Sequence, residues 1–379
     1  MKLSIWMAGL LASACLSTQI AAAEIPPATM AIIEDLQLRS AEVGMSKHPQ
    51  WQPQKVVVAL PPQISVMMPD YESALQAVAG NVELVFDRSG GFTISPELLV
   101  GADGIIGVCN APNMAAADDR LIWLHSYFAG MDSCQGFSDA QKEIIVFSNS
   151  KRLSGPTIAE HSIAMLMAIT RGLPAFGRAQ NEKRWDNELS ASVRFGDLSE
   201  KTMLIAGLGG IGTEIARRAH GLGMRVIATR NSSRTGPDYV DYIGLADELP
   251  KLAKEADVMV NALPLTRSTT ALFDQQFFDA SKPGAIFISV GRGRSTVTAD
   301  LISALESGQL YGAGLDVTDP EPLPVDSPLW QMENVIITPH SSGAGIDGMR
   351  RLTTIAVENL RRYVAGEPLL NLVDINKGY

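Results

Sequence analysis

The stretch that decides the fold is KTMLIAGLGGIGTEIARRAHGLGMRVIAT, residues 201–229. Its apolar run 203–206 leads into glycines with G-x-G-x-x-G spacing, and residues 213–221 then place small and apolar side chains on one helical face. A second apolar run, 223–229, closes the unit. A strand, a glycine turn, a helix and a second strand in this order are typical of a dinucleotide-binding unit.

Each glycine of this turn has a physical role. Gly207 permits the tight turn, Gly209 lets the backbone approach a pyrophosphate, and Gly212 lets the helix pack on the strand. The free N–H groups at the start of the helix then face the phosphates. A purely structural turn is the alternative, and the strand–helix–strand context disfavours it. The residues expected to bind the cofactor here are Gly207, Leu208, Gly209, Gly210, Ile211 and Gly212.

The residues after the second strand bear on the choice of cofactor. A unit that binds NAD has an acidic residue about 20 positions after the glycines, which accepts a hydrogen bond from the ribose 2′-OH. Arg230 stands there instead, and no carboxylate lies between Arg225 and Arg234. Arg230, Ser232, Ser233 and Arg234 suit a 2′-phosphate. The stretch favours NADP over NAD, and a solvated basic loop remains the alternative.

Length and charge narrow the class of protein. A chain of 379 residues is long enough for two domains with sizeable cores. Its net charge of −10 and the lack of a long basic run argue against a nucleic-acid partner. Cys109 and Cys134 offer no metal-binding spacing, so no metal is expected. A disulfide between them is compatible with the sequence but cannot be deduced from it.

The first 23 residues resemble an export signal. Lys2 supplies a positive charge, residues 3–16 form an apolar core, and alanines 21–23 offer a cleavage site. We therefore expect an exported, periplasmic protein that has no membrane attachment after cleavage. A lipid anchor at Cys15 fits the flanking residues poorly. The polar extension 24–54 should contain one helix over 30–43 and then a linker.

Strands and helices alternate through the rest of the chain, which predicts mostly parallel sheets. Residues 155–177 read as a long apolar helix and as the hinge into the second domain, while 349–365 should pack back on the first domain. The expected strands are 55–60, 82–86, 104–108, 121–125 and 144–147, then 203–206, 223–229, 258–263, 285–290, 311–317 and 335–338. The other expected helices are 71–79, 95–100, 115–119, 213–221 and 299–305.

Three polar side chains follow strand ends, where open α/β sheets bind their ligands. Arg292 lies in a glycine-flanked turn, Glu321 precedes a proline, and His340 follows one. Taken singly, each has an ordinary explanation as a surface ion pair, a solvated acid or a hydrogen-bonded loop residue. Together at one sheet edge, they predict a single site.

Seven collinear motifs make the chain resemble the D-isomer-specific 2-hydroxyacid dehydrogenase family over about residues 55–365. They are GLGGIG (207–212), NALPLT (261–266), KPGAIFI (282–288), GRG (291–293), GAGLDV (312–317), EP (321–322) and NVIITPH (334–340). The resemblance implies an α/β fold of two doubly wound parallel-sheet domains. A Rossmann cofactor domain, 156–343, would be inserted in a flavodoxin-like substrate domain made of 55–155 plus 344–379.

The resemblance also implies roles for individual residues. Arg292 would hold the substrate carboxylate and polarise its carbonyl, His340 would be the general acid/base, and Glu321 would orient that histidine. Hydride transfer to a 2-oxo acid builds negative charge on the carbonyl oxygen, which a protonated histidine and a guanidinium stabilise. The backbone N–H groups of Phe128 and Ala129 would face the substrate. Leu263, Pro264, Asp316 and His340 would lie at the cofactor.

The implied activity is hydride transfer between NADP(H) or NAD(H) and a small 2-oxo acid or D-2-hydroxy acid. The bulk of Tyr127 and Phe128 favours glyoxylate, hydroxypyruvate or pyruvate, and family members commonly pair as homodimers. Reduced nicotinamide cofactor is scarce outside the cytosol. An exported nucleotide-binding or scaffold protein without turnover is therefore the alternative, although the arginine–glutamate–histidine set favours the enzyme.

Overall fold

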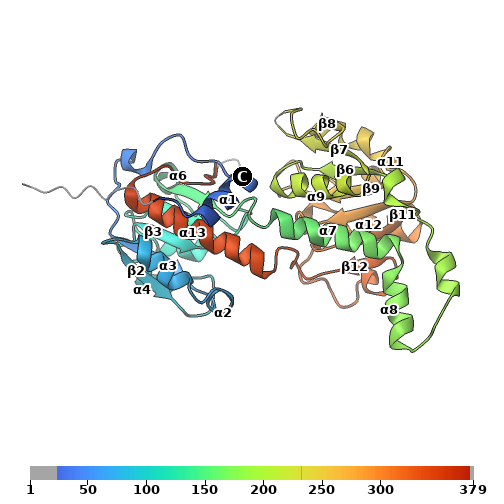
Figure 1. Cartoon of the computed structure of the whole chain (residues 1–379), viewed down its shortest axis with the longest axis horizontal. Helices are drawn as coiled ribbons and strands as arrows, with labels where there is room; N and C mark the ends of the chain where they lie inside the picture. The colour runs from blue at the N-terminus through green and yellow to red at the C-terminus, as the bar shows by residue number, and fades with distance from the viewer. Residues whose placement is uncertain (1–23, 232, 376–379) are drawn as a thin grey trace, which may run out of the picture.

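The fold consists of two parallel sheets, each with helices packed against it (Figure 1). The computed structural model describes residues 24–231 and 233–375. The expected export signal, the candidate lipid anchor Cys15 and the candidate cofactor ligand Ser232 lie outside the described residues. The two-sheet α/β architecture confirms the predicted fold class.

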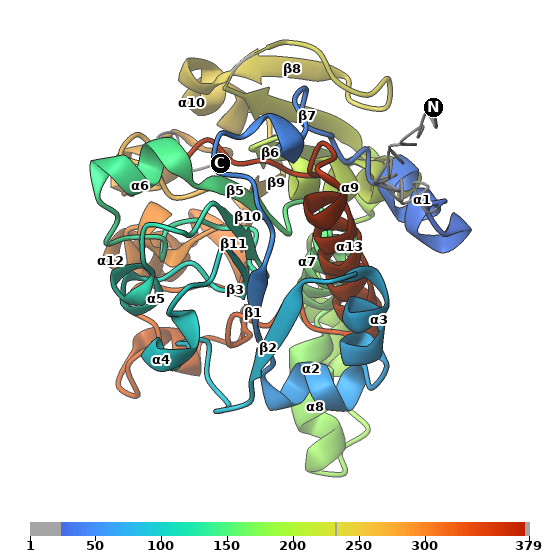
Figure 2. The same ribbon diagram turned by 90° about the vertical axis from the view of Figure 1, so that its left-hand side faces the viewer.

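The first sheet has five strands in the order β2-β1-β3-β4-β5. Figure 2 shows helices on both of its sides, with α3 and α13 on one and α4, α5 and α6 on the other. Its strands are β1 (Lys55–Ala59), β2 (Glu83–Asp87), β3 (Gly104–Gly107), β4 (Trp123–Ser126) and β5 (Val146–Asn149). Its helices are α2 (Pro62–Met67), α3 (Tyr71–Val78), α4 (Pro96–Leu99), α5 (Ala111–Ala116) and α6 (Asp139–Ile144).

The second sheet has seven strands in the order β12-β11-β10-β9-β6-β7-β8. Its chain order reverses beside β6, which is paired with β7 on one side and β9 on the other. An open α/β sheet binds its ligand at such a reversal. The strands are β6 (Thr202–Ala206), β7 (Arg225–Arg230), β8 (Tyr242–Leu245), β9 (Val258–Asn261), β10 (Ala285–Ser289), β11 (Leu310–Leu315) and β12 (Val335–Ile337).

Helices cover both faces of this sheet because its strands are apolar on both sides. One face packs on α7 (Gly155–Thr170) and α9 (Gly210–Gly221), through residues such as Met165 and Ile215. The other face packs on residues such as Leu252, Phe277 and Leu301. These come from α10 (Leu249–Ala253), α11 (Gln275–Ala280) and α12 (Thr298–Glu306). The sheet is therefore doubly wound.

The last long helix, α13 (Ile346–Ala365), returns to the first sheet, as expected (Figure 1). The ring of Tyr363 stacks on Trp123 with 4.6 Å between centroids, and its hydroxyl donates to Asp103 Oδ1 at 2.8 Å. The chain thus ends on the sheet where it began, while residues 156–343 lie between. We keep 55–155 plus 344–379 and 156–343 as the proposed domain boundaries.

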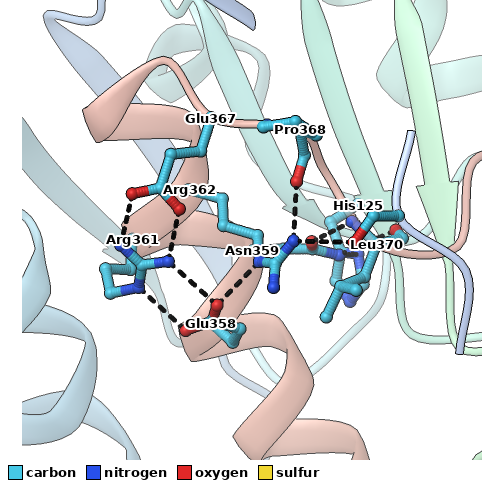
Figure 3. Close-up of polar contacts among 9 residues, drawn as sticks. His125, Glu358, Asn359, Arg361, Arg362, Glu367, Pro368 and Leu370 are labelled. Atoms are coloured by element: carbon cyan, nitrogen blue, oxygen red, sulfur yellow. Dashed lines mark hydrogen bonds and ion pairs between the residues drawn. The ribbon is translucent and has the colours of Figure 1, made fainter. Parts of the chain in front are cut away.

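A buried polar cluster anchors the end of α13 (Figure 3). Glu358 accepts hydrogen bonds from Arg361 and Arg362, with the shortest at 2.6 Å from Arg362 Nε. Arg361 also pairs with Glu367, and Arg362 donates to the Pro368 carbonyl oxygen. Each guanidinium therefore has acceptors on more than one side, as a buried charge requires.

Three helix predictions differ from the structure. The helix expected over 30–43 is α1, Pro27–Asp35, because Leu36 and Leu38 pack with Leu153 and Leu370 instead. The helix expected over 115–119 is α5, which starts earlier because the Asn110 side chain caps the Asn113 N–H. The helix expected over 155–177 is divided by Gly172, at φ +65°, into α7 and α8 (Leu173–Asn181). Strand β8 was not expected.

Candidate active site

The glycine turn has the geometry that a close-approaching phosphate needs. A Cβ at Gly212 would lie 2.1 Å from the Gly207 carbonyl oxygen, so only glycine lets α9 start this close to β6. Gly207 itself has φ +98°. A Cβ at Gly209 would point into open space, so the backbone there is accessible to a ligand. The turn thus fits a dinucleotide at the N-terminus of α9.

The arginines beyond β7 are held in different ways. Arg230 Nη1 donates to the Thr235 carbonyl oxygen at 2.5 Å, and Ser233 Oγ lies 3.1 Å from Thr235 Oγ1. Arg234 pairs with Glu248 at 2.7 Å. Binding a 2′-phosphate with Arg234 would require its guanidinium to leave or share this carboxylate. Arg230 and Ser233 contact uncharged oxygens of Thr235 rather than a carboxylate.

One cation beside the glycine turn was missed by sequence reasoning. Arg152 adopts φ +73°, and its Cγ lies 2.6 Å from where a Cβ of Gly210 would stand. Burial, and then the nearby positive charges of Arg39 and Arg230, lower the pKa of Arg152. Cations from three distant segments therefore gather at the N-terminal end of α9. No local motif predicts this, because only the tertiary fold brings the segments together.

The contact expected between His340 and Glu321 is present. His340 Nδ1 lies 2.9 Å from Glu321 Oε2, and Glu321 Oε1 accepts a hydrogen bond from the Thr318 N–H at 3.1 Å. The carboxylate is thus held by the backbone and in turn fixes the imidazole ring. The side chains of His340 and Glu321 are 48% and 40% exposed, so the far ring nitrogen is accessible to a small molecule.

Asp316 organises the loop that presents His340. It accepts hydrogen bonds from the N–H groups of Ser341 at 2.8 Å and Ser342 at 3.0 Å, and from Thr338 Oγ1 at 2.6 Å. Burial alone would raise the pKa of Asp316, but these hydrogen bonds outweigh it and lower the pKa. Its carboxylate therefore stays ionised and holds the loop. A contact with the nicotinamide remains a prediction.

Arg292 reaches across to the first domain. Its Nε and Nη2 donate to Asp132 Oδ1 at 3.1 and 3.0 Å, and its Nη1 donates to the Gly291 carbonyl oxygen at 2.8 Å. Burial would raise the pKa of Asp132, but the hydrogen bonds and charge of Arg292, and the charge of His340, lower it. Arg292, Asp132 and His340 therefore form one electrostatic cluster. Sequence reasoning did not assign Asp132 to the site.

The candidate substrate loop, 126–132, is tied down at several points. The Phe128 N–H donates to Ser126 Oγ at 3.2 Å, and Asn149 Nδ2 donates to the Ala129 carbonyl oxygen at 2.7 Å. A disulfide joins Cys109, after β3, to Cys134, just beyond the loop. The pairing that the sequence left open is thus present. Substrate binding by the Phe128 and Ala129 N–H groups remains a prediction.

The motif at 261–266 lies against the Arg292 turn. A Cβ at Gly291 would lie 2.6 Å from the Leu263 carbonyl oxygen, and Asn261 Nδ2 donates to Ser295 Oγ at 2.7 Å. Leu263 and Pro264 therefore line the same strand ends as Arg292, which agrees with a place near the cofactor. Among residues 24–231 and 233–375, no three His, Cys, Asp or Glu side chains gather as a metal site requires. No helix in those ranges is long and apolar enough to cross a bilayer.

Comparison with known proteins decides the family. Residues 163–342 match the model of the D-isomer specific 2-hydroxyacid dehydrogenase, NAD binding domain. The chain is also 30% identical over 283 residues to the glyoxylate reductase of Korarchaeum cryptofilum, with 73% of this chain and 84% of that protein covered. The chain belongs to the D-isomer-specific 2-hydroxyacid dehydrogenase family. Membership confirms the enzyme class that the motifs implied.

Solved structures support the same assignment for this dehydrogenase. A D-isomer specific 2-hydroxyacid dehydrogenase from Xanthobacter autotrophicus, in complex with NADPH and MES, superposes with a TM-score of 0.71 at 29% identity. The comparison covers 86% of this chain and 100% of that one. The NADPH-dependent glyoxylate/hydroxypyruvate reductase of Sinorhizobium meliloti, in complex with NADP and sulfate, gives a TM-score of 0.69 at 26% identity, with the same coverage.

Proposed function

We propose that this dehydrogenase transfers a hydride between NADP(H) or NAD(H) and a small 2-oxo acid or D-2-hydroxy acid, such as glyoxylate or hydroxypyruvate. The observation that carries the proposal is the His340–Glu321 pair at 2.9 Å, in one electrostatic cluster with Arg292 at the strand ends of the second sheet. The reductases of Korarchaeum cryptofilum and Sinorhizobium meliloti, related in sequence and structure, support the substrate class.

The residues divide the work as follows. The nicotinamide, when bound, supplies or takes the hydride. His340, held through Nδ1 by Glu321, presents Nε2 as the atom that gives a proton to the carbonyl oxygen or takes it from the hydroxyl. Arg292 binds the substrate carboxylate and stabilises negative charge on the carbonyl oxygen. The N–H groups of Phe128 and Ala129 would hold the carboxylate from the other domain, which requires the Phe128 N–H to leave or share Ser126 Oγ.

We propose NADP as the favoured cofactor. Donors for a 2′-phosphate are carried by Arg230, Ser232 and Ser233. Arg152 adds a cation beside the glycine turn. The Xanthobacter and Sinorhizobium structures hold NADPH and NADP, which supports this preference. NAD remains the competing cofactor in the assay below.

Assembly and localisation are also proposals. The segment around α8 extends away from the second sheet (Figure 1) and exposes large apolar side chains, with Trp185 at 92% and Leu173 at 54%. We propose that it buries these side chains against a second copy in a homodimer. We further propose that residues 1–23 direct export to the periplasm, where the disulfide between Cys109 and Cys134 is stable.

The experiment uses the purified mature chain, residues 24–379, with NADPH or NADH and a panel of 2-oxo acids, while cofactor absorbance is followed. We expect oxidation of NADPH with glyoxylate or hydroxypyruvate, and slower oxidation of NADH. Nucleotide binding without oxidation by any 2-oxo acid would instead support an exported binding or scaffold protein. Failure to bind either nucleotide would overturn the proposal.

A further inference from the structure

The substrate arginine is already bound to a carboxylate of the protein itself. Asp132 Oδ1 accepts from both Nε and Nη2 of Arg292, and no side chain at residue 130 obstructs the approach because that residue is glycine. A Cβ at Gly130 would lie 1.8 Å from Arg292 Nη2. The fold therefore provides space for this ion pair between the two domains. The ion pair between Arg292 and Asp132 affects which substrates Arg292 can accept.

The ion pair with Asp132 occupies one edge of the Arg292 guanidinium and leaves the donors of another edge for a ligand. An arginine carries five N–H donors in a planar fork. The Nε and Nη2 donors on one edge go to Asp132, and one Nη1 donor goes to the Gly291 carbonyl oxygen. The remaining Nη1 and Nη2 donors lie together at the tip of the fork. They suit two acceptors side by side, such as one carboxylate oxygen and the adjacent carbonyl oxygen of a 2-oxo acid.

The charges around this tip are balanced before a substrate arrives. Asp132 offsets Arg292, and Glu321 offsets His340 when its ring is protonated. A substrate with one carboxylate adds one negative charge beside a cation that still has free donors. A substrate with a second carboxylate would add another charge close to Asp132. Like charges placed together in an interface repel each other, which disfavours the wrong partner.

The loop that carries Asp132 is also unsuited to a second carboxylate. The ring of Phe128 packs edge-on against Phe92 with 5.1 Å between centroids, and both side chains remain partly exposed. A carboxylate placed against this pair would lose hydration without gaining a hydrogen-bond donor. Asp132 and Phe128 on this loop, with Phe92 packed against Phe128, therefore disfavour the same class of substrate.

We propose that Asp132 is a specificity-determining residue that restricts the enzyme to 2-oxo acids with a single carboxylate. It presents the tip of the Arg292 guanidinium to the substrate and repels a second carboxylate. This inference rests on the proposed function, because it names the substrate class of the same site. The acid acts through charge, so a neutral residue of the same shape removes the restriction.

The test compares Asp132→Asn with the wild-type enzyme. Glyoxylate and pyruvate serve as substrates with one carboxylate, and oxaloacetate and 2-oxoglutarate as substrates with two. For Asp132→Asn, we expect the ratio of kcat/KM for oxaloacetate to kcat/KM for glyoxylate to rise by about tenfold or more. Loss of a merely structural contact would lower both constants and leave the ratio unchanged.

Matched variants keep the result interpretable. Asp132→Glu retains the charge and should retain the wild-type ratio. Asp139→Asn, which changes an exposed acid of α6 in the same domain, should also leave it unchanged. If Asp132→Asn shows no cooperative thermal unfolding, Asp132→Ser takes its place. An active wild-type enzyme with an unchanged ratio in the neutral variant overturns this inference alone. A wild-type enzyme that reduces no 2-oxo acid overturns the proposed function as well.

Discussion

His340 is brought into position by hydrogen bonds to Asp316 that the motifs themselves do not reveal. Its backbone N–H donates to the Asp316 carbonyl oxygen at 2.8 Å, and its φ of +50° turns the ring toward Glu321. Asp316 holds the next two residues through its side chain. The motif at 334–340 predicted the histidine and its approximate position. It could not predict these supporting bonds, which depend on the pairing of β11 with β12.

His340→Asn should remove most of the turnover. Asparagine keeps a similar size but cannot exchange a proton with the substrate, so kcat should fall by about 10²–10⁴-fold. The dissociation constant for NADPH should stay nearly unchanged, because the glycine turn, where the phosphates are expected to bind, is untouched. Steady-state kinetics and a fluorescence titration with NADPH measure the two quantities. His220→Asn, on the exposed side of α9, is the control. Turnover near the wild-type rate would exclude His340 as the acid/base.

His125 should make the free energy of unfolding depend on pH. It is fully buried in β4, and burial lowers its pKa to about 3. Its Nδ1 lies 3.2 Å from Asn359 Nδ2 (Figure 3). Because that amide nitrogen can only donate, Nδ1 is the acceptor and the ring proton sits on Nε2. The folded protein therefore holds His125 neutral, whereas the unfolded chain protonates it near pH ~6.5.

The direction of this pH dependence follows from the proton that the unfolded chain takes up. Between about pH 6.5 and pH 3 only the unfolded chain carries the extra proton, so stability falls as pH falls, by about 1.4 kcal/mol per pH unit. Urea unfolding at about pH 7, 6 and 5 measures this slope. His125→Gln, which cannot titrate, should show a shallower slope than the wild-type protein. Parallel slopes would show that His125 titrates normally.

At the scale of helices and strands, the pattern of apolar residues predicted which elements form better than it predicted where the helices begin and end. The strands of both sheets were found nearly where expected, since buried parallel strands are continuous apolar runs. The helix at 30–43 was misplaced because its end depends on distant partners, and the helix at 115–119 because its start depends on a local side-chain cap. Leu36 packs on Leu153, and Asn110 forms a cap that an apolar pattern does not reveal. Arg152 was missed because only the tertiary fold brings it beside the glycine turn.

The buried cluster on α13 should be the part of that helix most sensitive to substitution. Glu358 is 3% exposed and forms ion pairs with both Arg361 and Arg362. Glu358→Gln leaves two buried guanidiniums with reduced compensation, so the free energy of unfolding should fall by about 3–5 kcal/mol. Urea denaturation measures the loss. Glu367→Gln, at a more exposed partner of Arg361, should cost less. Equal losses in the two variants would contradict this interpretation of the cluster.

At the scale of the whole molecule, the site belongs to both domains. The convergence of Arg292, Glu321 and His340 could be predicted, because all three follow strand ends of one parallel sheet. Asp132 could not, because it comes from the other sheet and meets Arg292 only once the two domains face each other. Sequence patterns thus placed Arg292, Glu321 and His340 together, and the family resemblance added the loop of Phe128 and Ala129, but the ion pair that joins the two walls is visible only in the tertiary structure.

The disulfide should matter for substrate more than for cofactor. It joins Cys109 to Cys134, and Ser133 Oγ donates to the Cys109 carbonyl oxygen at 3.0 Å, so the residues beyond Asp132 are held to the end of β3. Replacing both cysteines by alanine should raise the KM for 2-oxo acids and lower stability by about 3 kcal/mol. Kinetics and thermal unfolding measure these effects. An unchanged KM would show that the loop holds its shape without the crosslink.

The same disulfide makes the state of the loop depend on the compartment in which the chain lies. A polypeptide still in a reducing compartment lacks the bond. The loop that carries Asp132 should then be less firmly held. The protein should then reduce 2-oxo acids slowly, even where reduced nucleotide is abundant. If residues 1–23 direct export as proposed, the crosslink would form in the oxidising compartment, and the loop would then be held as described. The compartment in which the protein matures would thereby determine its rate of turnover, without a separate inhibitor.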